Sequence, residues 1–323
     1  MAPSTGDIAE PLGAFLRGVV DDVRRLSGGA SRETFAFTLT KPGETEGVPL
    51  ILQRVRSSTL ASGFSMVAEA DLLRAAGASG VPVAPVVDAS DDASIVGAPF
   101  IVVERLPGET IARRILRDDA YAVARERLIE QSAQALARVH AIDPSSVGNL
   151  KREDQLSSVL SIYDMLTPDM GTHPAFDIGF RELERSRPES QREVVLHGDY
   201  RLGNLLVDEQ GLVAALDWEI AHLGDPLEDL AWFSIRAWTF GGPGEVAGVG
   251  TVDELLGAYE AASGTTVDVD AFRWWRAFET LKWGVICMLQ AHTHLSGASR
   301  SVELATIGRR VCENEYDLLR LLR

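Results

Sequence analysis

A short apolar strand, a polar loop and an apolar hairpin follow one another in the second half of this chain, and this succession most constrains its fold. Residues 196–205 read Leu-His-Gly-Asp-Tyr-Arg-Leu-Gly-Asn-Leu, and residues 216–219 read Leu-Asp-Trp-Glu. The apolar segments predict a strand, then a loop with Asp199 at its tip, and then a hairpin with a polar turn. Such a hairpin places Asn204 beside Asp217, and the loop holds Asp199 close to both.

These side chains have the chemistry that phosphoryl transfer from ATP requires. A carboxylate such as Asp199 can orient an attacking hydroxyl and accept its proton. Asn204 and Asp217 supply oxygen ligands for the magnesium ions that bridge nucleotide phosphates. Asp and Asn also serve turns, and we assign only that role to Asp208. The spacing of the other three matches the catalytic loop of kinases, with His197 in support, and predicts a catalytic site.

Two short motifs carry a resemblance to a known group of kinases. His-Gly-Asp at 197–199 stands where protein kinases have His-Arg-Asp, and Asp-Trp-Glu at 217–219 stands where they have Asp-Phe-Gly. These motifs resemble the aminoglycoside phosphotransferase and choline kinase superfamily. The run from Leu216 to Trp232 is similar to the branch that includes the phosphotransferase domains fused to acyl-CoA dehydrogenases.

The resemblance has consequences for both fold and cofactor. It implies an α+β fold of the bilobal protein-kinase type, with an antiparallel sheet in the N-lobe and a mainly helical C-lobe. It also implies ATP and Mg2+ as cofactors and a small-molecule hydroxyl as the phosphate acceptor. ATP and GTP are not distinguished, and neither are aminoglycosides, amino alcohols, sugars and hydroxyacyl-CoA compounds as acceptors.

Composition limits which partners the protein is expected to bind and in which compartment it is expected to lie. The 323 residues include 31 basic and 47 acidic side chains, and the net charge of -16 argues against nucleic acid and anionic membrane surfaces. No apolar run reaches the ~18 residues of a membrane span, and Asp7 and Glu10 do not fit a signal peptide. Cys287 and Cys312 are expected to be buried free thiols. We therefore expect a cytoplasmic protein, of undetermined oligomeric state.

A shift in pattern divides the chain into an N-lobe, residues 1–106, and a C-lobe, residues 107–323. The N-lobe alternates short apolar runs with turns, whereas the C-lobe has helical periodicity. The N-lobe elements are predicted as a helix over 8–26, strands over 34–40 and 48–55, a helix over 65–76, and strands over 83–88 and 100–104. The C-lobe is predicted to contain helices over 121–140, 227–238 and 272–290.

The nucleotide phosphates are expected under a glycine-containing loop in the N-lobe. Ser27, Gly28, Gly29 and Ser31 lie between the first helix and the first strand, where backbone N–H groups can contact phosphate oxygens. Two glycines before a strand also fit a simple turn, and the resemblance favours the phosphate loop. The chain has no Walker A motif, so a P-loop enzyme is disfavoured.

A kinase also needs a cation paired with a helical carboxylate in the N-lobe. Glu69, in the middle of its predicted helix, fits the carboxylate. The strand over 48–55 contains no lysine, and Arg54 is the candidate cation, with Gln53 in that position if the register slips by one. A solvent-facing Arg54 on an edge strand is the alternative.

The remaining assignments depend on the resemblance or stay open. The resemblance makes the Glu104 carbonyl and the Leu106 N–H the adenine contacts. Asp225 either caps the helix that follows it or braces the catalytic loop, and we favour a structural role for it and for Asp229. Trp274 and Trp275 cannot both face the core of one helix, so one of the two is a candidate for the acceptor cleft.

Two rival functions are weaker. A protein kinase needs an activation loop, and residues 217–226 run almost directly into a helix. A nucleotide-binding pseudokinase is favoured by the absence of the strand lysine, but Asp199, Asn204 and Asp217 are all present. We therefore predict an active small-molecule kinase.

Overall fold

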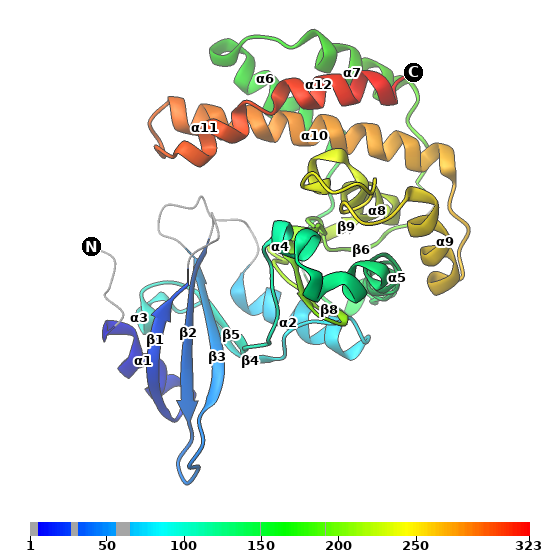
Figure 1. Cartoon of the computed structure of the whole chain (residues 1–323). Helices are drawn as coiled ribbons and strands as arrows, with labels where there is room; N and C mark the ends of the chain where they lie inside the picture. Colours follow the sequence, from blue (N-terminus) through cyan, green and yellow to red (C-terminus); the bar gives the residue numbers. More distant parts are fainter. Residues whose placement is uncertain (1–5, 27–31, 56–64, 149, 191) are drawn as a thin grey trace.

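The computed structural model describes residues 6–323 except 27–31, 56–64, 149 and 191. The phosphate loop expected at Ser27, Gly28, Gly29 and Ser31 lies outside the described residues. In Figure 1 a five-stranded sheet occupies the lower left, and a mainly helical lobe lies above it and to the right. This is the bilobal α+β architecture that the motifs implied. The lobe boundary between residues 106 and 107 stays a prediction.

The N-lobe is built on one antiparallel sheet. Its strands are β1 (Val19–Arg25), β2 (Arg32–Thr40), β3 (Val48–Val55), β4 (Val86–Ser90) and β5 (Phe100–Glu104). They pair in the order β1-β2-β3-β5-β4. Strand residues alternate between the two faces of a sheet, so each face has its own set of side chains.

Different helices cover the two faces of this sheet. One face, which includes Phe35, Leu52 and Phe100, packs against α1 (Gly6–Leu16) and α3 (Ala93–Val96). The opposite face, with Ile101 and Val103, packs against α2 (Met66–Ala78) and continues into the core of the C-lobe. Only this second face therefore borders the region between the lobes.

The C-lobe is mainly helical. Its α-helices are α4 (Ala112–Arg117), α5 (Ala122–Val139), α6 (Gln155–Met170), α7 (Pro174–Arg185), α8 (Pro226–Ser234), α9 (Val252–Ser263), α10 (Val269–Leu295), α11 (Val302–Gly308) and α12 (Val311–Leu321). Two small antiparallel sheets join β6 (Val194–Leu196) to β9 (His222–Gly224) and β7 (Leu205–Asp208) to β8 (Gly211–Ala215). Helix α10 crosses the top of the lobe, between α8 below and α6, α7 and α12 above (Figure 1).

The prediction of a helix over residues 8–26 is wrong for the second half of that range. Helix α1 ends at Leu16, Arg17 has a left-handed φ of 58°, and the chain continues as β1. The valines between residues 19 and 23 fit a helical pattern as well as a strand. Pairing with β2, together with the β propensity of valine, decides for the strand.

The other predicted elements lie close to their expected positions. Strand β5 coincides with residues 100–104, whereas β2 begins two residues before the predicted start, at Arg32. The helix predicted over 227–238 stops at Ser234, because Ile235 is extended and a 3-10 turn, η4 (Arg236–Thr239), follows.

The structure also bears on membrane-spanning helices and on the two cysteines. Among the described residues, no helix is both long and apolar enough to cross a bilayer. Cys287 and Cys312 are free thiols, and Cys287 is buried as expected. Cys312 is exposed, so the expectation of burial is wrong for that residue.

Two helical glycines should respond oppositely to replacement by alanine. In α10, a Cβ at Gly284 would lie 2.4 Å from the Phe176 ring, so Gly284→Ala should destabilise the fold by about 1–3 kcal/mol through overpacking. In α9, a Cβ at Gly257 would meet no atom within 4 Å, so Gly257→Ala should stabilise it by about 0.5–1 kcal/mol. Urea denaturation measures both changes, and equal signs would contradict the packing described for α10.

Candidate active site

The predicted hairpin is present and brings the ends of its two strands together. The 3-10 turn η3 (Leu202–Asn204) leads into β7, and β8 runs antiparallel to it. The Leu216 N–H donates to the Asn204 carbonyl at 2.8 Å. This bond joins the backbone of Asn204 to the residue before Asp217, so both residues lie at the same end of the hairpin.

The Asp199 carboxylate is held by three donors. Asn204 Nδ2 donates to Oδ2 at 2.7 Å, and Trp232 Nε1 donates to Oδ1 at 2.8 Å. Arg201 Nε donates to Oδ1 at 3.0 Å. These contacts come from the loop, the hairpin and α8, so the orientation of the carboxylate depends on three separate parts of the C-lobe.

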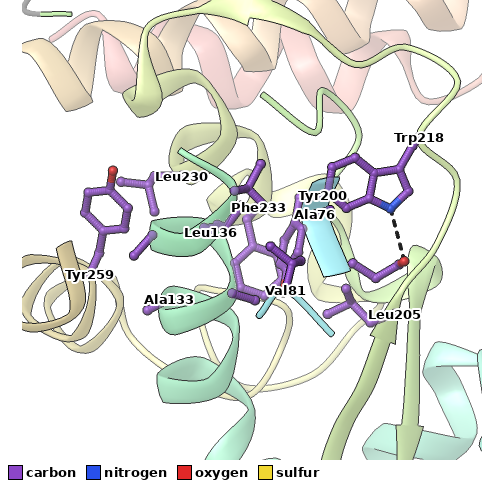
Figure 2. Close-up of a cluster of buried hydrophobic side chains, with 14 of the residues drawn as sticks. Ala76, Val81, Ala133, Leu136, Tyr200, Leu205, Trp218, Leu230, Phe233 and Tyr259 are labelled. Atoms are coloured by element: carbon purple, nitrogen blue, oxygen red, sulfur yellow. Dashed lines mark hydrogen bonds between the residues drawn. The ribbon is translucent and has the colours of Figure 1, made fainter. Parts of the chain in front are cut away.

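Buried aromatic residues anchor the two acidic residues of the site. Asp199 is followed by Tyr200 and Asp217 by Trp218, and both aromatic side chains are buried in the core cluster of Figure 2. The Trp218 indole also donates to the Ala215 carbonyl at 3.1 Å, drawn there as a dashed line. Each acidic residue is therefore placed by the packing of its neighbour.

His197 connects the catalytic loop to the end of β8. The Asp199 N–H donates to His197 Nδ1 at 3.2 Å, so Nε2 carries the proton and donates to the Leu216 carbonyl at 3.0 Å. Burial lowers the pKa of this imidazole, which fits a neutral ring with one donor and one acceptor nitrogen. His197 thus supports the site by fixing the backbone on both sides of it.

Asp229, on α8, braces the catalytic loop through its carboxylate. Its carboxylate accepts from the His197 N–H at 2.8 Å and the Gly198 N–H at 2.9 Å, and it also contacts His140 Nε2 at 3.2 Å. Burial would raise the pKa of Asp229, but the hydrogen bond and charge of His140 and the contact with His197 bring it down to about 2. Asp225 instead caps α8 by accepting from the Leu227 N–H at 2.9 Å.

Asp217 differs from Asp229 in how its charge is balanced. It has a left-handed φ of 64° and is half-buried at the end of the hairpin. Burial and the negative charge of Glu219 raise its pKa to about 7, although Arg32 opposes the shift. A cation placed beside Asp217 would relieve this imbalance and favour the ionised form.

The predicted pairing of Arg54 with Glu69 is wrong. Arg54 lies on the α1 side of the sheet, where Nε donates to Glu33 at 2.8 Å and Nη1 donates to the Val96 carbonyl at 2.6 Å. The physical reason is strand alternation, since β3 turns Arg54 to the same side as Leu52.

Arg32 on β2 is the partner of Glu69. Nη1 and Nη2 donate to the two carboxylate oxygens at 2.7 and 2.5 Å. Nη1 also lies 3.4 Å from Gln53 Oε1, and Nε lies 3.3 Å from Glu219. Arg32 was not among the predicted site residues, because the strand was predicted to start at Thr34. Extending the alternation back by two residues would have placed Arg32 on the face of β2 opposite Phe35.

The predicted hinge joins directly to the catalytic hairpin. Strand β5 ends at Glu104, and the following segment pairs with β7 through two bonds, Glu109 N–H to the Val207 carbonyl at 2.8 Å and Val207 N–H to the Glu109 carbonyl at 3.0 Å. Gly108 permits this approach, because a Cβ there would lie 2.7 Å from the Leu206 side chain. The adenine contacts at Glu104 and Leu106 stay a prediction.

Comparison with models of protein families assigns the chain to one of them. Residues 22–278 match the model of the phosphotransferase enzyme family. The chain belongs to this family.

Sequence relatives of this phosphotransferase are much longer proteins. It is 30% identical over 191 residues to acyl-CoA dehydrogenase family member 10 of Mus musculus, a match that spans 57% of this chain and 18% of the relative. It is 26% identical over 270 residues to family member 11 of Gallus gallus, which spans 79% of this chain and 32% of the relative. The chain thus covers about a fifth to a third of these relatives.

Solved structures share the fold at low sequence identity. A candidate aminoglycoside phosphotransferase of Ralstonia eutropha JMP134 has a TM-score of 0.77 at 20% identity, with 97% of each chain covered. A choline/ethanolamine kinase family protein of Mesorhizobium loti has a TM-score of 0.66 at 16% identity, covering 99% of this chain and 93% of its own. A thermostable mutant of aminoglycoside phosphotransferase APH(4)-Ia, solved with ADP and hygromycin B, has the same TM-score and identity, with 98% of each chain covered.

Aromatic side chains of the phosphotransferase line one side of Asp199. Trp232, which donates to Asp199, packs against Trp238 and Trp283 with ring centroids 5.1 and 6.1 Å away. The Arg201 guanidinium lies 4.9 Å from the centroid of the Trp238 ring. These three tryptophans were not predicted as site residues, because their spacing along the chain also fits an ordinary core.

The two adjacent tryptophans of α10 border a cavity that Asp199 does not line. Trp274 is buried and donates to the Leu183 carbonyl at 2.9 Å, whereas Trp275 is half-buried. Both line a cavity of about 320 Å3 that Asp225 and Glu228 also border. Their role in an acceptor cleft stays a prediction.

Removing the carboxylate of Asp229 should cost the phosphotransferase more stability than removing that of Asp225. Asp229→Ala leaves two loop N–H groups and His140 without their buried acceptor, and we expect a loss of about 3–5 kcal/mol. Asp225→Ala removes a helix cap, with an expected loss of about 0.5–2 kcal/mol. Urea denaturation at neutral pH measures both.

The pH dependence provides a second check on Asp229. Its folded-state pKa of about 2 lies below the ordinary 3.8, so its contribution is fully present above 3.8 and is lost as the pH falls through about 2. The difference between wild type and Asp229→Ala should therefore stay constant from about pH 5 to about pH 8. A difference that disappears within this window would contradict the brace.

Proposed function

We propose that this chain is an ATP-dependent kinase that transfers the γ-phosphoryl group to a hydroxyl of a small molecule, with Asp199 as the catalytic residue. One observation carries the proposal. Asp199 is fixed by Asn204, Trp232 and Arg201 at the end of a hairpin that also bears Asp217. Phosphoryl transfer depends mostly on positioning and charge neutralisation. The fixed Asp199 carboxylate would supply the positioning, and a magnesium ion held by Asn204 and Asp217 would supply the neutralisation.

Asp199 positions the acceptor hydroxyl and takes its proton. Its carboxylate can be approached by a further donor because each oxygen accepts from more than one direction. The contacts with Trp232 and Arg201 prevent the carboxylate from rotating, so the hydroxyl is aligned with the phosphorus atom before bond formation. The aromatic side formed by Trp232, Trp238 and Trp283 limits where the acceptor can lie.

Asn204 and Asp217 would hold magnesium, and their donor chemistry fits this ion. The Asn204 amide nitrogen donates to Asp199, which leaves the amide oxygen for a cation, and the raised pKa of the half-buried Asp217 carboxyl reflects a shortage of positive charge around it. No cluster of three or more His, Cys, Asp or Glu ligands exists among the described residues, and Mg2+ needs none when phosphate oxygens and water complete its shell. When bound, the ion neutralises phosphate charge.

The nucleotide is proposed to bind between the lobes. Glu104 and Leu106 would contact adenine at the hinge, and the loop over 27–31 would cover the phosphates. The relative solved with ADP and hygromycin B supports nucleotide use together with a small-molecule acceptor. The net charge of -16 favours such an acceptor over nucleic acid and accords with a soluble cytoplasmic protein.

The acceptor class is the open part of this proposal. The fold relatives support aminoglycosides and amino alcohols. The acyl-CoA dehydrogenase family members, which are much longer than this chain, support testing hydroxyacyl-CoA thioesters as well.

ADP release should depend on both an acceptor and Asp199. We expect turnover with one class in a panel of aminoglycosides, amino alcohols, sugars and hydroxyacyl-CoA thioesters, measured by coupled production of ADP from ATP or of GDP from GTP. Asp199→Asn should lower kcat by about 10^2- to 10^4-fold, because the proton acceptor is lost. Asp208→Asn is the matched control, since the donors to Asp208 within the described part of the chain are the turn N–H groups of Gln210 and Gly211.

The outcomes separate three functions. Acceptor-dependent turnover that vanishes in Asp199→Asn identifies a kinase and its acceptor class. Nucleotide binding without turnover favours the pseudokinase. Equal loss in Asp199→Asn and Asp208→Asn would show that the site assignment is wrong, and no nucleotide binding would refute the proposal.

A further inference from the structure

The strand that carries the phosphate-binding lysine in protein kinases has no cation on the corresponding face in this chain. Within β3, residues 48–55, the side chain directed toward the α2 side of the sheet next to the site is Gln53, which is neutral. The only arginine within these residues, Arg54, points to the α1 side and is paired with Glu33. A kinase mechanism that needs a cation here must obtain it from another element.

The neighbouring strand supplies that cation. Arg32 is the first residue of β2, and it shares a face with Thr34, the residue paired with Gln53. Its guanidinium extends past Gln53 and forms a bidentate pair with Glu69, with side chains only 9% and 4% exposed. This is the carboxylate that the sequence assigned to the strand cation.

Arg32 also reaches the part of the C-lobe that would hold magnesium. Its Nε lies 3.3 Å from Glu219, two residues after Asp217, and the charge of Arg32 acts on Asp217 as well. The phosphates of a nucleotide bound between the lobes would lie in this region, between β2 and the end of the hairpin. The guanidinium therefore brings a positive charge to the place where Glu219 and the end of the hairpin meet the N-lobe, and a phosphate oxygen bound there would compete with the Glu219 carboxylate for Nε.

Given the function proposed above, we infer that Arg32 on β2, and not a residue of β3, contacts and positions the phosphate groups of the nucleotide. Glu69 orients the guanidinium, and Gln53 occupies the place of the strand lysine and accepts from Arg32. The positive charge has moved by one strand within the sheet while its carboxylate partner has stayed on α2.

Moving the charge back to β3 tests this inference. The probes are Mg-ATP and adenosine, titrated calorimetrically into wild type, Arg32→Gln, Arg32→Gln/Gln53→Lys and Arg54→Gln. Adenosine lacks the phosphates, so the ratio of the two affinities isolates the phosphate contacts from the adenine pocket. Thermal melting of each variant without nucleotide checks that it is folded.

Arg32→Gln should lower the affinity for Mg-ATP by about 10- to 100-fold and leave that for adenosine unchanged. In Arg32→Gln/Gln53→Lys, the lysine can pair with Glu69 from β3, and most of the Mg-ATP affinity should return. Arg54→Gln loses a buried arginine from the opposite face, and its affinity ratio should equal that of wild type. If Arg32→Gln does not fold because Glu69 is left unpaired, Arg32→Gln/Glu69→Gln replaces it, with the same expected loss.

Each contrary result has a distinct meaning. Unchanged Mg-ATP affinity in folded Arg32→Gln, or in its replacement, would overturn the inference while leaving the proposed kinase function intact. The same holds if Gln53→Lys restores nothing, or if Arg54→Gln loses as much affinity as Arg32→Gln. Wild type that binds neither Mg-ATP nor adenosine would overturn the proposed function and this inference together.

Discussion

The contact between the Asp229 carboxylate and the backbone of the catalytic loop is the interaction on which the rest of the site depends. Two consecutive N–H groups, those of His197 and Gly198, donate to it, and Gly198 has a φ of 82° with its Cα close to the Ile220 carbonyl. A side chain at Gly198 would clash there, so only glycine permits this geometry. His140, on the opposite side, contacts both Asp229 and Tyr259, so packing among α5, α8 and α9 determines where the loop lies.

Asp229 is fully buried and Asp217 is half-buried, and the fold treats their charges differently. Asp229 is surrounded by donors, and its pKa falls to about 2, as expected for a carboxylate with a structural role. Burial and the negative charge of Glu219 raise the pKa of Asp217 to about 7. Asp229 has donors around its carboxylate, whereas the charge of Asp217 is only partly balanced by the protein. This difference is expected if Asp217 receives a cation. The contrast therefore supports Asp217 as a ligand without reference to any sequence motif.

The sequence predicted the parts of the site that are local and missed the parts that depend on distant contacts. The hairpin, the loop and β5 follow from apolar segments and turns only a few residues apart, and they lie where the sequence placed them. Arg54 was misassigned because the choice between the two faces of β3 depends on α1 and α2, which lie elsewhere in the chain. The brace from Asp229 is likewise a contact across about 30 residues, which neither spacing nor composition reveals.

A group of buried charged side chains also contributes to the position of Trp232, which donates to Asp199. Lys282 lies 3.1 Å from Glu228 and 5.2 Å from the centroid of the Trp232 ring, whose N–H donates to Asp199. Burial would lower the pKa of His222, but the charge of Glu228 raises it to about 9, so both neighbours of Glu228 are cationic at neutral pH. Isolated buried charges are costly, and here each has an opposite partner, which holds Lys282 against the indole. The orientation of Asp199 therefore depends on ion pairs in the core as well as on its own hydrogen bonds.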